Sequence, residues 1–122
     1  MTVRPIAATL VGILLLVMLA ACGGSGQPAG STKVTMTEYK FDPSPLTAKA
    51  GKVDFYLVNA GTVAHDVLIV ASSGKIISKS ALVSAGDSFD FSVSNLPAGS
   101  YQVYCDVPGH KESGMVATLE VT

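Results

Sequence analysis

The sequence predicts an all-β domain over residues 33–122, folded as a Greek-key antiparallel β-sandwich of seven to eight short strands. Apolar and polar residues alternate in short runs between turn-forming residues, and no segment of this range has a regular 3.6-residue apolar period. Residues 96–101 match the Leu-x-x-Gly-x-Tyr tyrosine corner of such sandwiches, in which the phenol bonds to the backbone upstream. An ordinary core position for Tyr101 is the alternative.

The first predicted strands lie on either side of a change of phase. Apolar residues alternate with polar ones in residues 34–36 and again, in the opposite phase, in residues 39–41. This change predicts a bulge near Thr37 or Glu38, because one extra residue switches the faces of a strand. The two prolines in residues 42–45 then break the strand.

The remaining strands are separated by turn signals. They are expected at residues 52–58, 63–70, 75–79, 88–93, 100–105 and 115–121. Gly61 and Gly74 mark the turns that follow the first and second of them. The run that begins at residue 88 alternates most cleanly, and its pattern places Phe89, Phe91 and Val93 on one face.

The N-terminal segment indicates export. Arg4 and the apolar run of residues 6–21 are typical of a signal peptide. The Leu-Ala-Ala-Cys sequence that ends at Cys22 resembles the bacterial lipobox, where a peptidase cuts before a lipidated cysteine. The expected division is a lipoprotein signal peptide at residues 1–21, a lipidated Cys22 with a flexible linker at residues 22–32, and the domain at residues 33–122. An uncleaved anchor helix, the alternative, also leaves the domain outside the cell membrane and tethered to it.

Composition limits the chemistry of the chain. Its formal net charge is -1 at pH 7, so no basic excess attracts nucleic acid. The chain has 2 His and 2 Cys, so a metal site must draw on these residues, carboxylates and Met, and a His-rich catalytic centre is excluded. If Cys22 carries lipid, Cys105 is the remaining thiol of an exported domain, where cysteines are normally paired.

Strand parity brings potential metal ligands to one end of the sandwich. His65, Cys105 and Met115 each share parity with the apolar residues of their predicted strand, and each lies at a strand end. His110 lies in the loop between Cys105 and Met115. A core histidine, a filler methionine and a free buried thiol are the alternatives for the individual residues. Together, a thiolate, two imidazoles and a weak thioether are the donors of a trigonal blue copper site.

This pattern resembles the cupredoxins, the small blue copper proteins that include plastocyanin, amicyanin, azurin and auracyanin. The resemblance covers residues 33–122 and is densest in residues 104–115. Its Cys-x-x-Pro-Gly-His start is similar to azurin, and its four-residue gap before Met is similar to auracyanin. The 39 residues between His65 and Cys105 are closer to the compact plastocyanin and amicyanin.

The resemblance implies one copper ion per chain, bound by His65 Nδ1, Cys105 Sγ and His110 Nδ1, with Met115 Sδ as the axial ligand. It also makes the N–H of Asp66 a candidate donor to the sulfur. Many cupredoxins have Asn where this chain has Asp66. An ionised carboxylate there lowers the reduction potential unless it is protonated or paired, and Asp106 raises the same question. Both could instead be solvated or capping carboxylates.

The expected function is one-electron transfer by a membrane-tethered, extracytoplasmic Cu(II)/Cu(I) carrier rather than an enzyme. His110 with Pro108 and Gly109 would form the surface through which electrons pass to transient redox partners; the alternative is a loop that merely covers the site. The chain is expected to be a monomer that binds no nucleic acid. Copper delivery or sequestration on the same fold is the rival function, and a metal-free adhesion or assembly domain is a third.

Overall fold

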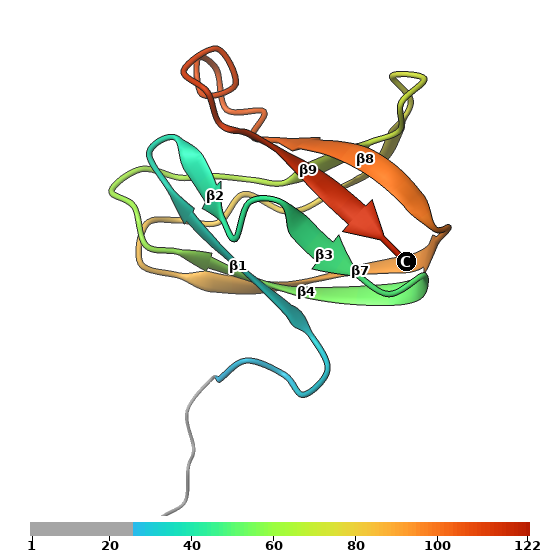
Figure 1. The fold of residues 1–122 in the computed structure, drawn as a ribbon. Helices are drawn as coiled ribbons and strands as arrows, with labels where there is room; N and C mark the ends of the chain where they lie inside the picture. The colour runs from blue at the N-terminus through green and yellow to red at the C-terminus, as the bar shows by residue number, and fades with distance from the viewer. Residues whose placement is uncertain (1–25) are drawn as a thin grey trace, which may run out of the picture.

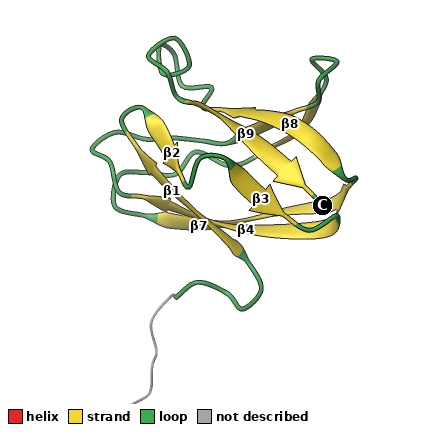
Figure 2. Cartoon of the chain, in the orientation of Figure 1, coloured by secondary structure: helices red, strands yellow, loops and turns green. Residues whose placement is uncertain are grey.

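The computed structural model describes residues 26–122, so the expected signal peptide and Cys22 lie outside the described residues. Two layers of strands face each other, and the described residues contain no helix (Figures 1 and 2). Among these residues, accordingly, no helix could cross a membrane. The strands in chain order are β1 (Thr32–Thr37), β2 (Lys40–Asp42), β3 (Leu46–Ala48), β4 (Gly51–Asn59), β5 (Leu68–Val70), β6 (Ile76–Lys79), β7 (Ser88–Leu96), β8 (Gly99–Tyr104) and β9 (Val116–Val121).

The predicted all-β sandwich is confirmed, although its sheets are mixed rather than purely antiparallel. One sheet has the order β2-β1-β4-β7 and the other β3-β9-β8-β5-β6. The β1–β4 and β3–β9 pairs run parallel, and the other pairs run antiparallel. Between the parallel strands β1 and β4, the chain leaves the first sheet after β2, adds β3 to the second sheet, and returns to the first sheet with β4.

The core fills the space between the two sheets. Period-two alternation in β4 buries Val53, Phe55 and Leu57, while the residues between them are partly exposed. Phe55 stacks on Phe91 of the paired strand β7 with ring centroids 5.9 Å apart. Leu119 on β9 contributes to the same core from the second sheet. Burial of these side chains holds the two layers face to face.

The change of phase near residue 38 marks a hairpin, so the predicted bulge is wrong. Thr37 pairs with Lys40 across the β1–β2 turn, and Glu38 and Tyr39 form the turn itself. The faces switch because the chain reverses, not because a strand gains a residue. The strand β3 was not predicted, because it has three residues and directly follows two prolines.

The predicted strand at residues 63–70 is a strand only in its second half. His65 forms an isolated antiparallel bridge with Val83, and the regular ladder begins at Leu68. The tyrosine corner is confirmed, because the Tyr101 hydroxyl donates a 2.7 Å hydrogen bond to the Pro97 carbonyl.

Candidate metal centre

The structure brings His65, Cys105 and His110 together from two separate regions of the chain. Their ligand atoms all lie within 4.8 Å of one another. The Nδ1 atoms of the two histidines are 3.1 Å apart, and Cys105 Sγ lies 3.9 Å from His65 Nδ1 and 3.5 Å from His110 Nδ1. His65 and Cys105 are fully buried, and His110 is 8% exposed.

Backbone hydrogen bonds to Val83 hold His65 in place. The His65 N–H donates to the Val83 carbonyl over 3.1 Å, and the Val83 N–H donates back to the His65 carbonyl over 2.8 Å. This two-bond bridge fixes the backbone at the ligand although no regular strand passes through it. The inward direction predicted for the His65 side chain agrees with its burial.

The other candidate ligands lie on one loop between β8 and β9. Cys105 follows β8 directly, and its N–H donates to the Met115 carbonyl over 3.2 Å. The Met115 N–H donates to the His110 carbonyl over 3.1 Å. Gly109 and Gly114 have φ values of 85° and 103°, which a side chain would disfavour, so the loop turns tightly on either side of His110. Met115 is fully buried, and these backbone bonds tie it to Cys105 and His110.

The donor set fits one copper ion per chain. The circle through the three ligand atoms has a radius of about 2 Å, close to the bond lengths of roughly 2.0–2.3 Å that nitrogen and sulfur form with a first-row metal ion. Two imidazoles and a thiolate, with the thioether of Met115 from the same loop, are donors that copper favours in both oxidation states.

The electrostatics of Cys105 link metal binding to proton release. Burial raises the pKa of the Cys105 thiol, while hydrogen bonds from the backbone N–H groups of Asp66 and Val107 lower the pKa in part. Without a metal ion the sulfur therefore retains its proton at neutral pH. When a metal ion binds to the sulfur as a thiolate, this proton is released. The two N–H groups then stabilise the negative charge on the sulfur.

Glu38 contacts the site and was missed by sequence reasoning. Its Oε1 lies 3.0 Å from His65 Nε2, the ring nitrogen that faces away from Cys105 and His110. The same oxygen accepts hydrogen bonds from the N–H groups of Thr62 and Val63 over 2.9 and 3.2 Å. These bonds, that from Thr62 foremost, lower the pKa of Glu38 to about 2. The carboxylate of Glu38 is therefore charged at neutral pH.

Asp66 joins the two ligand-bearing segments and is paired with a lysine. Its buried carboxylate accepts a 2.7 Å hydrogen bond from the Asp106 N–H. Lys79 Nζ lies 3.4 Å from Asp66 Oδ2 and 2.5 Å from Asp106 Oδ2, and the hydrogen bond to Asp106 is the main reason why the pKa of Lys79 is raised. Of the alternatives for Asp66, the structure supports a paired carboxylate.

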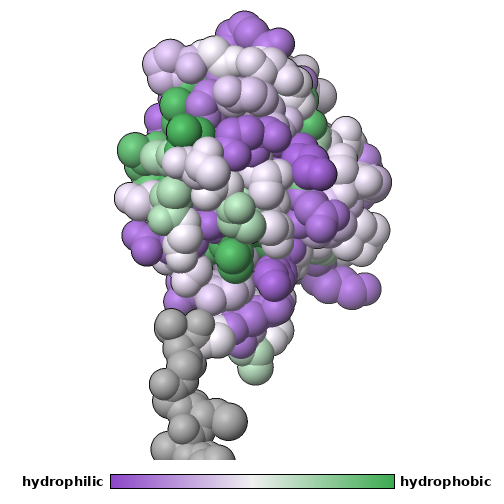
Figure 3. Space-filling view, turned by 90° about the vertical axis from the view of Figure 1, so that its left-hand side faces the viewer, coloured by the Kyte–Doolittle hydropathy of each residue, from purple (hydrophilic) through white to green (hydrophobic). Residues whose placement is uncertain are grey.

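The surface over the cluster is mixed, because uncharged residues lie beside the exposed Lys111 and Glu112, which carry one charge of each sign. Pro108 and Gly109 are exposed, and the His110 ring contacts Tyr39 edge-on with centroids 5.0 Å apart. Val63 and Leu82, which neighbour the His65–Val83 bridge in the chain, are 42% and 60% exposed. Figure 3 shows that apolar groups on this side of the molecule are interspersed with pale and hydrophilic ones.

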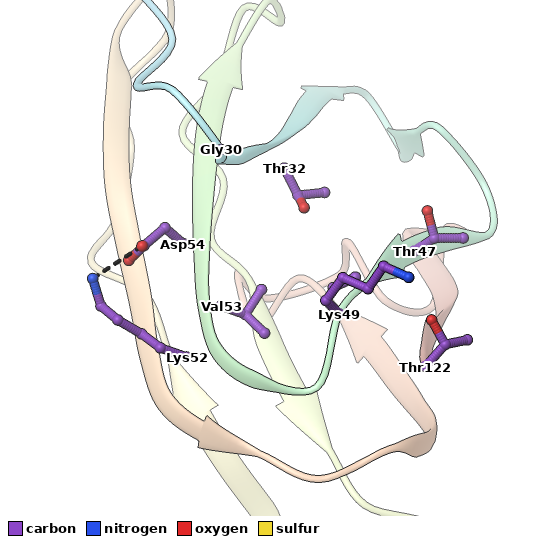
Figure 4. A pocket seen from close by; sticks show the side chains of 9 residues that line it. Gly30, Thr32, Thr47, Lys49, Lys52, Val53, Asp54 and Thr122 are labelled. Carbon is purple, nitrogen blue, oxygen red and sulfur yellow. Dashed lines mark hydrogen bonds and ion pairs between the residues drawn. The ribbon is translucent and has the colours of Figure 1, made fainter.

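A separate cavity lies at the other end of the sandwich and contains none of the proposed ligands. It has a volume of about 460 Å³ and is lined by the C-terminal Thr122, Lys49 and the ion-paired Lys52 and Asp54, among others (Figure 4). Its lining is polar and includes both signs of charge. The cluster of soft ligands is therefore distinct from this cavity.

Comparisons with known proteins agree with the fold and the donor set. Residues 8–117 match the Cupredoxin-like domain family. A copper-resistant cuproprotein, CopI, of Rubrivivax gelatinosus is 28% identical over 116 residues, covering 81% of this chain and 70% of its own. The fold is similar to that of reduced auracyanin from Roseiflexus castenholzii, with a TM-score of 0.66, 18% identity and coverage of 79% of this chain and 99% of the other. The blue copper protein auracyanin A from Chloroflexus aurantiacus gives a TM-score of 0.62 at 22% identity, covering 76% of this chain and 100% of the other.

Proposed function

The chain belongs to the cupredoxin-like domain family, and we propose that it transfers single electrons by means of one copper ion. The observation that carries this proposal is the buried convergence of His65, Cys105 and His110, with ligand atoms within 4.8 Å. Met115 would be a fourth and weaker ligand. Copper bound there would supply a Cu(II)/Cu(I) couple that accepts one electron from a donor protein and passes it to an acceptor.

The protein would keep the site rigid during electron transfer. The backbone of His65 is bridged to Val83, and the backbone of Met115 is bonded to both Cys105 and His110. Ligands held in this way need to move little when the charge of the metal changes. Burial of the thiolate excludes water from the sulfur.

Electrons would enter and leave through the His110 edge of the site. His110 is the ligand with measurable exposure among the three clustered residues, and Pro108 and Gly109 beside it are exposed. A small, weakly charged surface suits a redox partner that binds briefly and dissociates. The protein would act as an extracytoplasmic monomer, anchored to the cell membrane through a lipid on Cys22 after removal of residues 1–21.

Copper delivery or sequestration is the second candidate function. It is favoured by the relative from Rubrivivax gelatinosus, whose name describes a copper-resistant cuproprotein. A delivery protein would exchange copper quickly with an acceptor. A carrier would instead retain its copper while it is oxidised and reduced repeatedly.

The test is the visible absorption of the copper-loaded protein. We expect an intense thiolate-to-copper band that Cys105→Ser abolishes, because the serine hydroxyl cannot replace the thiolate. Ser113→Ala, in the same loop, is the matched control and should keep the band. A colourless Cu(II) complex of the wild type would refute the proposal. Reversible voltammetry without rapid loss of copper to a competing chelator would favour the carrier over delivery.

A further inference from the structure

We propose that Glu38 is a positioning residue of the copper site, which orients the His65 ring and makes the site favour Cu(II) over Cu(I). This inference rests on the proposed copper function. It concerns a residue 27 positions before His65, in the turn between β1 and β2. Its carboxylate contacts the His65 ring and the backbone that precedes His65.

The carboxylate of Glu38 accepts a hydrogen bond from the imidazole of His65. A neutral imidazole has one N–H, and an ionised carboxylate can only accept a hydrogen bond. Because Glu38 Oε1 lies 3.0 Å from His65 Nε2, the proton belongs on Nε2. The lone pair of Nδ1 is then directed at Cys105 and His110, as metal binding requires.

Backbone N–H groups hold the Glu38 carboxylate in position. Glu38 Oε1 also accepts hydrogen bonds from the N–H groups of Thr62 and Val63, which lie three and two residues before His65. One oxygen therefore joins the β1–β2 turn to the segment that carries the ligand. His65 is fully buried, whereas the Glu38 side chain is 27% exposed, so the carboxylate closes the outer side of the imidazole.

Gly61 is the third observation, because it leaves the space that the carboxylate occupies. A Cβ atom at residue 61 would overlap Glu38 Oε1, and the backbone there does not have the positive φ that would itself require glycine. Gly61→Ala would therefore displace the carboxylate without touching His65 or the other ligands. It is an independent way to remove the Glu38 contact.

The charge of Glu38 gives the contact a redox consequence. A carboxylate hydrogen-bonded to a ligand imidazole makes the imidazole a stronger donor and attracts the ion of higher charge more strongly. Asp66 differs in this respect, because Lys79 pairs with its carboxylate. Loss of the Glu38 carboxylate should weaken Cu(II) binding more than Cu(I) binding, and so raise the reduction potential.

The main experiment compares the full chain with Glu38→Gln, Glu38→Ala and Gly61→Ala. For Glu38→Ala we expect Cu(II) affinity to fall about 10- to 100-fold. At 59 mV per tenfold change, this corresponds to a potential about 60–120 mV higher if Cu(I) affinity is unchanged. Gly61→Ala should shift the potential in the same direction, and Glu38→Gln should do so less, because glutamine keeps an acceptor oxygen. Glu120→Gln, which removes one charge at a residue bonded to Ser100, is the control and should leave the potential unchanged.

A second measurement does not need copper. In the metal-free protein, nitrogen-15 NMR should place the His65 proton on Nε2 in the wild type and on a mixture of both nitrogens in Glu38→Ala. A proton on Nδ1 in the wild type would overturn the inference. Reduction potentials equal to that of the wild type in all three variants would also overturn the inference. If the wild type is blue in that case, the proposed function is unaffected. A wild type without the thiolate-to-copper band would instead overturn the proposed function. If Glu38→Ala does not fold, Glu38→Gln and the wild-type tautomer still decide the question.

Discussion

Replacing Asn59 by Ala should destabilise the domain strongly, because this side chain holds the segment before His65. Asn59 is 1% exposed. Its Nδ2 donates to the carbonyls of Val63 and Val83 over 2.8 and 2.9 Å, and its Oδ1 accepts the Gly61 N–H over 2.9 Å. The substitution removes all three hydrogen bonds and leaves their backbone partners near or inside the protein interior.

The size of the effect follows from these contacts. Each hydrogen bond contributes about 0.5–1.5 kcal/mol net, and a buried group that loses its partner costs about 1–3 kcal/mol. The Val83 carbonyl keeps the His65 N–H as a partner, so its loss is partial. We therefore expect the free energy of unfolding to fall by about 2–4 kcal/mol. With an m value of about 2 kcal/mol/M, the urea midpoint should fall by about 1–2 M.

Urea denaturation followed by circular dichroism measures this change. Asn95→Ala on β7, where the side chain is exposed, is the matched control and should change the free energy of unfolding by less than about 0.5 kcal/mol. Asn59→Asp should destabilise the domain at least as much as Asn59→Ala, because a buried carboxylate would face the Val63 and Val83 carbonyls with no hydrogen to donate. A loss below about 1 kcal/mol in Asn59→Ala would refute the reasoning, since fewer than two of the three bonds would then contribute.

Three further substitutions test other parts of the structure. Lys79→Met should lower the reduction potential in voltammetry, because the buried Asp66 carboxylate loses its cation and then stabilises Cu(II). Asp54→Asn should destabilise the protein above pH 4, with an effect that shrinks in urea titrations at lower pH. The hydroxyl of Ser92 lowers the pKa of Asp54, so its stabilisation is present above the unfolded pKa and is lost as the pH falls through the folded pKa. Leu119→Ala, at a fully buried position, should lower the free energy of unfolding by about 2–5 kcal/mol.

For each of these three predictions, a control variant or an opposite trend would contradict the expected result. Lys75→Met, which removes an exposed lysine in the β5–β6 turn, is the control for Lys79→Met. An equal shift of the reduction potential in both variants would show that the effect does not depend on the ion pair with Asp66. For Asp54→Asn, a destabilisation that grows as the pH falls would reverse the expected sign. Val116→Ala lies on the same strand as Leu119 and is 37% exposed, so similar losses at both positions would argue against burial as the cause.

The sequence predicts those parts of the structure that depend on local pattern. The alternation that buries Phe55 and Leu57 is visible in the chain, and so is the tyrosine corner at Tyr101. The cluster of His65, Cys105 and His110 was expected because parity placed His65 and Cys105 at strand ends and because the loop after Cys105 carries His110. These features need only a strand period and a known motif.

Features that depend on contacts between distant segments were not predictable in the same way. The role of Glu38 depends on a hairpin at residues 38–39 that brings its carboxylate to a histidine 27 residues later. Lys79 reaches Asp66 and Asp106 only because β6 lies at the edge of the sheet beside β5. The strand predicted at residues 63–70 lacks its first half for a similar reason. His65 there pairs only with Val83, which lies in a loop remote in the sequence.

The direction of β1 determines which way the site would face in an anchored protein. Thr32 at its start helps to line the cavity beside the C-terminus, whereas the turn after its end carries Glu38 to His65. Its six residues span about 20 Å. Figure 1 shows that the chain before β1 turns back beneath the sheet that contains β4, on the side of the domain away from the loop between β8 and β9. A molecule held by its N-terminus would point its redox surface outward, where a partner could reach it without contacting the surface that holds the anchor.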